Sequence, residues 1–291
     1  MIDLLGAATE RGIRWAEPLF SDLRLFLLAG SQGREAATLV AERSRLPRLR
    51  LEELHCLAPF EPGGKILAHV VNYRGHDRDA GVTAPSKPFF FQKPSSSVSG
   101  PGDPIIASRH SSKCDHEVEL AIVIGRVARD VRPEDAYDVI GGYTVLNDVS
   151  YRDFQMNEDG PELNRSYGKN WTQAKGMDFS CPMGPVLVLT DELPRPYPLR
   201  ITCRVNGRVR QDASTADMIF KAPELIAEIS RGMTLFPGDV IATGAPAGGG
   251  LADGRYLSPG DLVECSIERI GVLRNPVVAD LATEASHVRA T

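Results

Sequence analysis

Two glutamates two residues apart, Glu117 and Glu119, stand at the start of an apolar run that ends at Gly125. The run has the composition of a β-strand, and side chains two apart on a strand point to the same face. Two carboxylates on one buried face repel each other and lose hydration, so each requires a proton, a basic partner or a metal ion. The same pair also fits the solvated edge of a sheet, where carboxylates need no such partner.

A third carboxylate, Asp148, follows directly on a second apolar run at residues 142–146. Together with Glu117 and Glu119 it forms a set of oxygen ligands with no cysteine nearby. Such a set favours Mg²⁺, Mn²⁺ or Ca²⁺ over zinc. The residues alone leave both readings open, a metal site and a solvated sheet edge.

The composition of the chain narrows the class of protein. Its 291 residues are 42% hydrophobic and 24% charged, as in globular proteins, and a net charge of -5 argues against nucleic acid as a partner. The five cysteines are scattered without a CxxC motif, which fits a reducing compartment. The sequence has neither a basic leader with an apolar run nor about 18 consecutive apolar residues, so we expect a cytoplasmic protein with no membrane partner.

Strands and turns must position the carboxylates. Short strand-like runs bounded by turn residues recur after residue 63, and Asn206-Gly207 is typical of a two-residue hairpin turn. Helices are predicted for residues 35–45, after residue 132 and for residues 222–230. We therefore predict a β-rich α+β fold, with a small N-terminal domain or extension at residues 1–62 and a catalytic domain at residues 63–291.

Seven stretches of the sequence, in order, resemble the fumarylacetoacetate hydrolase superfamily between Lys65 and about Pro276. The resemblance implies a mixed β-sandwich roll, a homodimer, and Mg²⁺ or a similar ion held by Glu117, Glu119 and Asp148. The matching stretches are NYRGH (72–76), FQKPS (91–95), HEVEL (116–120), GYTVLNDVSYRD (142–153), WTQAKGMD (171–178), VNG with RQD (205–212) and PGDVIATGAP (237–246).

The same resemblance suggests roles for further residues. His76 matches the family's catalytic histidine, Lys175 the lysine that faces the substrate, and Thr243 the threonine at the substrate's carboxylate end. Thr243 lies in a glycine-rich turn, so the backbone N–H of Gly244 is a further candidate donor to a carboxylate. Tyr73, in the stretch that carries His76, is expected to contact the substrate as well.

Three features near these residues bear on the acid–base pair and on the pocket. Asp79 lies three residues after His76 and would orient the imidazole if both stand on one helical turn, where the family's hydrolases often have glutamate. Residues 156–170 form a longer polar segment than is usual in the family, and Ala245 replaces a more familiar threonine. The last two features put the identity of the substrate in question without altering the chemistry.

The resemblance implies a small 2-oxo or dioxo carboxylate as substrate. The main prediction is a metal-dependent hydrolase of a C–C bond in a 2,4-dioxo acid such as an acylpyruvate or fumarylpyruvate. The metal would polarise the 2-oxo acid, His76 would activate water, and Lys175 would bind the carboxylate or the developing oxyanion.

The alternative is a decarboxylase or an isomerase (tautomerase) of a 2-oxo acid, such as oxaloacetate or a ring-cleavage product of aromatic catabolism, at the same metal site. A binding protein without activity is a third class, against which the complete set of metal and acid–base residues argues.

Overall fold

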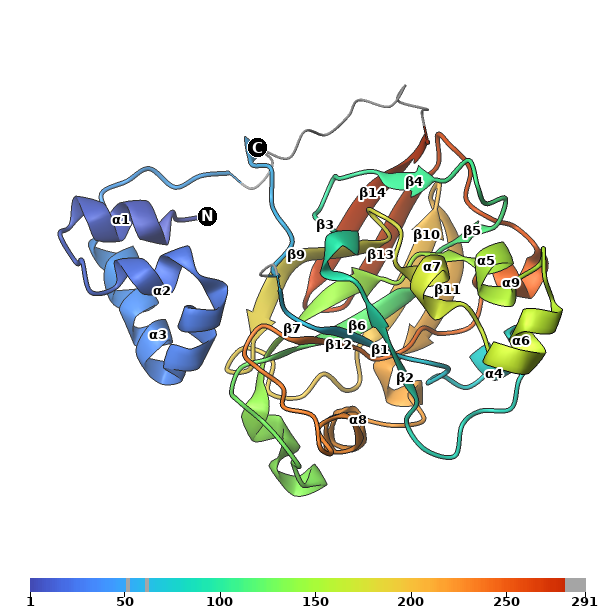
Figure 1. Ribbon diagram of the computed structural model, residues 1–291. Helices are drawn as coiled ribbons and strands as arrows, with labels where there is room; N and C mark the ends of the chain where they lie inside the picture. Colours follow the sequence, from blue (N-terminus) through green and yellow to red (C-terminus); the bar gives the residue numbers. More distant parts are fainter. Residues whose placement is uncertain (51–52, 61–62, 281–291) are drawn as a thin grey trace, which may run out of the picture.

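The computed structural model describes residues 1–50, 53–60 and 63–280 and is built around two β-sheets (Figure 1). The larger sheet has the strand order β2-β1-β12-β6-β7-β9-β3. It is mixed, because β1 is parallel to β12 and β3 to β9 while the other neighbours are antiparallel. Its strands are β1 (Ile66–His69), β2 (Phe90–Lys93), β3 (Val98–Ser99), β6 (Val118–Ile124), β7 (Ile140–Asn147), β9 (Cys181–Leu189) and β12 (Val240–Ala242).

The second sheet has the order β11-β10-β13-β14-β4, and β5 pairs with β8 in a small two-stranded sheet. Asn206 and Gly207 join β10 to β11, and both have positive φ, which confirms the predicted hairpin turn. The strands are β4 (Ile105–Ala107), β5 (Cys114–Asp115), β8 (Ser150–Tyr151), β10 (Arg200–Val205), β11 (Arg208–Ser214), β13 (Leu262–Ile267) and β14 (Gly271–Ala279).

The main hydrophobic core joins the two large sheets. Leu120 of β6 and Val145 of β7 belong to the same buried cluster as Ile201 of β10 and Val263 of β13. Burial of such apolar surface contributes roughly 25 cal/mol per Å² and is the main driving force for this packing. The predicted β-rich α+β fold with a mixed sandwich core is confirmed.

Five short helices gather at one end of the sheets, on the right in Figure 1. Elsewhere α8 (Ala222–Ile229) packs against the 3₁₀ helix η3 (Pro133–Val139), so both helices predicted for these segments are present. The five at the end of the sheets are α4 (His76–Asp79), α5 (Arg152–Met156), α6 (Glu162–Tyr167), α7 (Trp171–Lys175) and α9 (Gly250–Asp253).

The N-terminal residues form three helices with a small apolar cluster of their own, drawn in blue in Figure 1. They are α1 (Leu4–Glu10), α2 (Glu17–Ser21) and α3 (Leu23–Arg43), and α3 extends the predicted helix toward the N-terminus. Leu27 of α3 joins the apolar cluster on the outer face of the larger sheet, together with Ile66 and Ala121.

The predicted domain boundaries remain a prediction. The division after residue 62 and the C-terminal limit at residue 291 both fall on positions outside the described residues. Within the described ranges, none of the helices combines the length and the apolar character that crossing a membrane requires.

Candidate active site

The pairing of β6 with β7 brings the three predicted carboxylates together. Glu119 lies in β6 and Glu117 immediately before it, while Asp148 follows β7, and the Asp148 backbone N–H donates to the Glu117 carbonyl at 2.9 Å. The three side chains are buried, and one carboxylate oxygen of each lies within 4.8 Å of the others. The carboxylates thus form a compact buried cluster rather than a solvated sheet edge.

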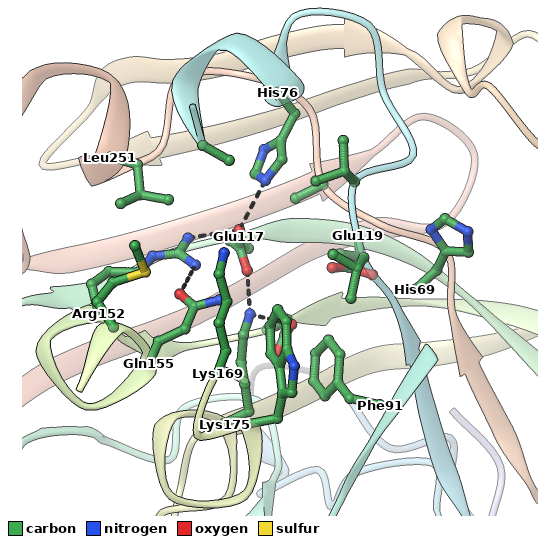
Figure 2. Close-up of a pocket in the computed structure, with 17 residues that line it drawn as sticks. His69, His76, Phe91, Glu117, Glu119, Arg152, Gln155, Lys169, Lys175 and Leu251 are labelled. Atoms are coloured by element: carbon green, nitrogen blue, oxygen red, sulfur yellow. Dashed lines mark hydrogen bonds and ion pairs between the residues drawn. The ribbon is translucent and has the colours of Figure 1, made fainter. Parts of the chain in front are cut away.

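Three buried cations, Lys93, Lys175 and Arg152, surround two of these carboxylates, and Figure 2 shows Lys175 and Arg152 beside Glu117. Lys175 of α7 pairs with Glu117 and, at 2.6 Å, with Asp148, whose other oxygen lies 2.8 Å from the Nζ of Lys93. Arg152 donates from its terminal nitrogen to Glu117 at 2.7 Å. Burial alone would raise the pKa of Glu117, but the positive charges of Arg152 and Lys175 outweigh it and hold that pKa well below its usual value.

Glu119 is the member of the triad for which the described residues provide no ion pair. Its Oε2 accepts a 2.6 Å hydrogen bond from the Gly244 N–H. Burial, together with the negative charges of Asp148 and Glu117, raises the pKa of Glu119 well above its usual value. The cluster therefore lacks one positive charge at Glu119, and an oxygen-ligated divalent cation fits that deficit.

Arg152 is fixed by a network behind the triad. Its Nε donates to Asp115 at 2.8 Å and its Nη1 to Gln155 at 2.9 Å, while Asp115 accepts the N–H of Gly250 at 2.5 Å. Burial opposes the charge on Arg152, but attraction to Glu117 and Asp115 raises the pKa of the guanidinium. Arg152 thus couples α5 and the loop before α9 to the carboxylates.

His76 reaches the pocket from α4, but Asp79 is not its partner. The chain bends between β1 and α4 with positive φ at Val71 and Gly75, and the His76 Nε2 lies 3.6 Å from the Glu117 carboxylate. The Nδ1 of His76 has no hydrogen-bond partner among the described residues. The carboxylate of Asp79 instead accepts the N–H of Gly248 at 2.8 Å, so the predicted pair of Asp79 and His76 is not formed.

The three other predicted substrate residues do not line the pocket. The Thr243 hydroxyl donates to the Leu120 carbonyl at 2.9 Å, because Thr243 continues the pairing of β12 with β6. Gly244 donates its N–H to Glu119, and Tyr73 is buried in the main core. Thr243 and Gly244 therefore support the strand that carries Glu119, and the substrate contacts predicted for these three residues gain no support from the geometry.

The pocket itself lies between α4, α5, α7 and the triad (Figure 2). Phe91 and Trp171 stack with ring centroids 4.8 Å apart and form one wall, and Ala245 lies in the lining as expected for a change near the substrate. His69 also lines it, and burial lowers the pKa of its imidazole to about 4. Of the predicted site residues, the lining contains His76, Lys175, Glu117, Glu119 and Asp148.

Sequence reasoning assigned no role to several residues of the site. Lys93 and Arg152 stand in stretches that carried the family resemblance, FQKPS and SYRD, yet their charge partners are distant in sequence. Lys169 belongs to the polar segment 156–170 that was expected to reshape the pocket, and the structure places it in the lining. For Lys93 and Arg152 the available signal was a basic residue inside a matched stretch.

Comparison with known proteins gives the class of this fold and site. The model of the fumarylacetoacetate (FAA) hydrolase C-terminal domain matches residues 65–278. The chain belongs to the fumarylacetoacetate hydrolase family, and the predicted family membership is confirmed.

Among its relatives the chain is similar to several named enzymes. It is 41% identical over 249 residues to the human "Oxaloacetate tautomerase FAHD2A, mitochondrial", covering 84% of this chain and 77% of that protein. A solved 2-hydroxyhepta-2,4-diene-1,7-dioate isomerase from Mycobacterium marinum is 39% identical, with a TM-score of 0.68 over 81% of this chain and 82% of that one. The fumarylacetoacetate hydrolase from Exiguobacterium antarcticum is also 39% identical, with a TM-score of 0.68 over 80% and 81%. The chain is therefore an enzyme of this family, and tautomerases and isomerases are prominent among its relatives.

Proposed function

We propose that this protein is a divalent-metal-dependent tautomerase or isomerase of a small 2-oxo acid of the oxaloacetate type. The observation that carries the proposal is the buried triad, in which Glu119 forms no ion pair with the described residues and opens on a pocket that also contains His76 and Lys175. The names of the tautomerase and isomerase relatives favour this alternative over the C–C hydrolase that was the main prediction from the sequence.

Glu117, Glu119 and Asp148 would hold the cation, for which Mg²⁺ is the first choice and Mn²⁺ or Ca²⁺ the others. When bound, the ion would withdraw electron density from the 2-oxo group and acidify the C–H bonds of the adjacent carbon. Lys93, Lys175 and Arg152 hold Glu117 and Asp148 in place by direct ion pairs, and the charges of Arg152 and Lys175 favour the ionised form of Glu117.

His76 is the proposed proton carrier. In keto–enol exchange the C3–H bond breaks and an O–H bond forms at the former carbonyl oxygen, with no net change in oxidation state. The imidazole faces the pocket, its Nδ1 has no partner among the described residues, and its Nε2 lies beside Glu117. A histidine in this place can take the proton from carbon and return it to oxygen.

The test is a tautomerase assay on oxaloacetate with protein stripped by chelator and reloaded with Mg²⁺ or Mn²⁺. We expect loss of the enol signal above the spontaneous rate only with metal, and a fall of at least about a hundredfold in Glu117→Gln. The matched control is Glu158→Gln, an exposed glutamate that pairs with Lys113, which should keep full activity. Metal-independent conversion, or an active Glu117→Gln protein, would refute the proposal.

Hydrolysis of a C–C bond is a second candidate because the Exiguobacterium relative is named a fumarylacetoacetate hydrolase and because His76 is placed to activate a water molecule. Release of pyruvate from an acylpyruvate measures this reaction directly. If pyruvate release exceeds tautomerisation and is lost in His76→Asn while tautomerisation survives, hydrolysis is the function.

The assembly and compartment of the protein are also proposals. We propose a homodimer, as the resemblance implies, which sedimentation measures directly. We also propose a reducing compartment: Cys56, Cys114, Cys181, Cys203 and Cys265 are all free thiols. The cytoplasm is the prediction from sequence, and the mitochondrial names of several relatives make the mitochondrion the alternative.

A further inference from the structure

One cation in the pocket lining has no task in the metal site. Lys169 lies between α6 and α7 and lines the pocket together with Lys175 and Arg152 (Figure 2). The ion pairs of the described residues include none for Lys169, and its Nζ lies 5.6 Å from the centre of the Trp171 ring. The other pocket cations are all committed: Lys175 to Glu117 and Asp148, Arg152 to Glu117 and Asp115.

The surroundings of Lys169 favour an anion next to its ammonium group. The side chain is half-buried, and burial together with the positive charges of Arg152 and Lys175 lowers the pKa of Lys169. A charge that is disfavoured by burial and by like charges gains most from an added carboxylate. The backbone that follows Lys169 is held in place as well, because the Trp171 N–H donates to the Lys169 carbonyl at 3.0 Å and Asn170 caps α7.

The charges of the site can be balanced group by group. The buried carboxylates Glu117, Glu119, Asp148 and Asp115 outnumber their buried cationic partners, Lys93, Lys175 and Arg152, by one. A divalent ion at the triad would offset that excess and one carboxylate of a bound 2-oxo acid. Lys169 would then remain as the one uncompensated charge among these pocket groups.

We propose that Lys169 binds the second carboxylate of the substrate, so that the protein selects 2-oxo dicarboxylic acids over 2-oxo monocarboxylic acids. This inference rests on the proposed function and specifies its substrate class. It also gives the unusual segment 156–170 a task, since Met156 and Lys169 at its two ends both line the pocket. Lys169 contacts the far end of the substrate and takes no part in proton transfer.

The test compares oxaloacetate with its 4-methyl ester, which keeps the 2-oxo carboxylate and the C3 hydrogens but lacks the second charge. Dissociation constants are measured by calorimetry, and KM and kcat by the tautomerase assay, for the wild type, Lys169→Met and Lys169→Arg. A charged hydrogen bond at a half-buried site is worth about tenfold in affinity. We expect Lys169→Met to weaken oxaloacetate about tenfold in Kd and KM with little change in kcat.

The ester should bind equally to the wild type and to Lys169→Met, and Lys169→Arg should restore most of the affinity for oxaloacetate. The matched control is Arg165→Met, which removes a positive charge from the exposed face of α6 in the same segment. It should leave the preference for the dicarboxylate unchanged.

The outcomes separate this inference from the proposed function. Tautomerisation of both compounds with no effect of Lys169→Met refutes the role of Lys169 and leaves the function standing. If oxaloacetate binds more tightly than the ester, and this difference depends on Lys169 but neither compound is turned over, the role of Lys169 is supported and the proposed tautomerase function is refuted. A fall in kcat for both compounds that Lys169→Arg does not repair would make Lys169 a proton-transfer residue and overturn the inference.

Discussion

The carboxyl group of Glu119 favours the protonated form in the metal-free protein and would favour the ionised form in the metal-loaded protein. Without metal, burial and the charges of Asp148 and Glu117 raise its pKa well above the usual value, so the neutral acid is favoured. A group with a raised pKa in the folded state stabilises the protein at low pH, and that contribution is lost as the pH rises through the folded pKa. A cation reverses this balance because it binds the ionised form and displaces the proton.

Glu119→Gln should therefore stabilise the metal-free protein at pH above the raised pKa, by about 1 kcal/mol or more for each pH unit of the shift, because a neutral amide replaces a buried charge. The same variant should gain little stability from Mg²⁺. Thermal unfolding with and without Mg²⁺ across pH measures both effects. Calorimetry in buffers of different ionisation enthalpy should show proton release when the wild type binds metal, and none in the variant.

A less stable metal-free Glu119→Gln protein that still gains normal stability from Mg²⁺ would contradict this account of Glu119. Glu158→Gln is the matched control, since the exposed carboxylate of Glu158 pairs with Lys113. That variant should behave as the wild type in both measurements.

His69 gives the protein a second dependence on pH, with the opposite sign. Burial lowers the pKa of its imidazole to about 4, and its Nε2 accepts the Phe89 N–H at 3.3 Å. Between the ordinary pKa of about 6.5 and about 4, His69 is protonated in the unfolded chain but neutral in the folded protein. The free energy of unfolding therefore falls as the pH drops toward about 4.

We expect His69→Gln to remove up to about 3 kcal/mol of this acid sensitivity, because glutamine presents an acceptor without a proton-binding site in this range. Urea unfolding at several pH values between 7 and 4 checks it. His110→Gln, at an exposed position, is the control. Equal acid sensitivity of the wild type and His69→Gln would show that another group is responsible.

At the scale of elements, the glycine-rich loop between β12 and α9 determines where α4 sits. Gly248 has φ +104, and a Cβ there would lie 2.0 Å from the Arg210 carbonyl oxygen, so no other residue fits. Its N–H anchors Asp79 at the end of the helix that carries His76. The loop thus links β12 to α4, which carries His76, the side chain proposed to move the proton.

Gly248→Ala should lower the free energy of unfolding by at least about 2 kcal/mol and reduce kcat through displacement of His76. Gly254→Ala is the matched control, because Gly254 also has positive φ, +74, but no atom lies near its added Cβ. It should cost only about 1 kcal/mol and leave kcat intact. Equal effects of the two substitutions would show that the close contact at Gly248 is unimportant.

The elements also explain which parts of the site were predictable from sequence. Glu117 and Glu119 share a face by the two-residue period of a strand, and Asp148 ends the neighbouring run, so local rules and the family resemblance together identified the triad. Lys93 and Arg152 were missed because their partners are fixed by tertiary packing alone. Thr243 was assigned to the substrate because the family resemblance implies that role, while its hydrogen bond to Leu120 depends on strand register.

At the scale of the whole molecule, α3 ties the N-terminal helices to the larger sheet. Leu27 is 6% exposed and lies in one apolar cluster with Ala121 and Val123 of β6, whereas the adjacent Leu28 is 54% exposed. A Cβ added at Gly141 would lie 2.8 Å from the Leu27 side chain, which shows how closely α3 approaches β7.

Leu27→Ala should lower the free energy of unfolding by about 2–4 kcal/mol, and Leu28→Ala by less than about 0.5 kcal/mol. The catalytic rate should be unchanged in both, because neither side chain is in the pocket lining. Urea unfolding followed by tryptophan fluorescence and by tautomerase activity makes the comparison. If Leu27→Ala leaves the main unfolding transition unaltered, the N-terminal helices are not coupled to the sheet.

The pairing of Val118 with Asn147 has a consequence for how this molecule can change over generations. A shift of one residue in β6 or β7 would turn the carboxylate side chains of that strand to the opposite face of the sheet. Insertion of a single residue in either strand would therefore disrupt the triad. Residues 157–170 lie outside both sheets and consist of connecting segments around the short helix α6, and such a surface segment tolerates changes in length at little cost. Changes in this segment can therefore alter the substrate pocket during evolution, while the carboxylate triad stays unchanged.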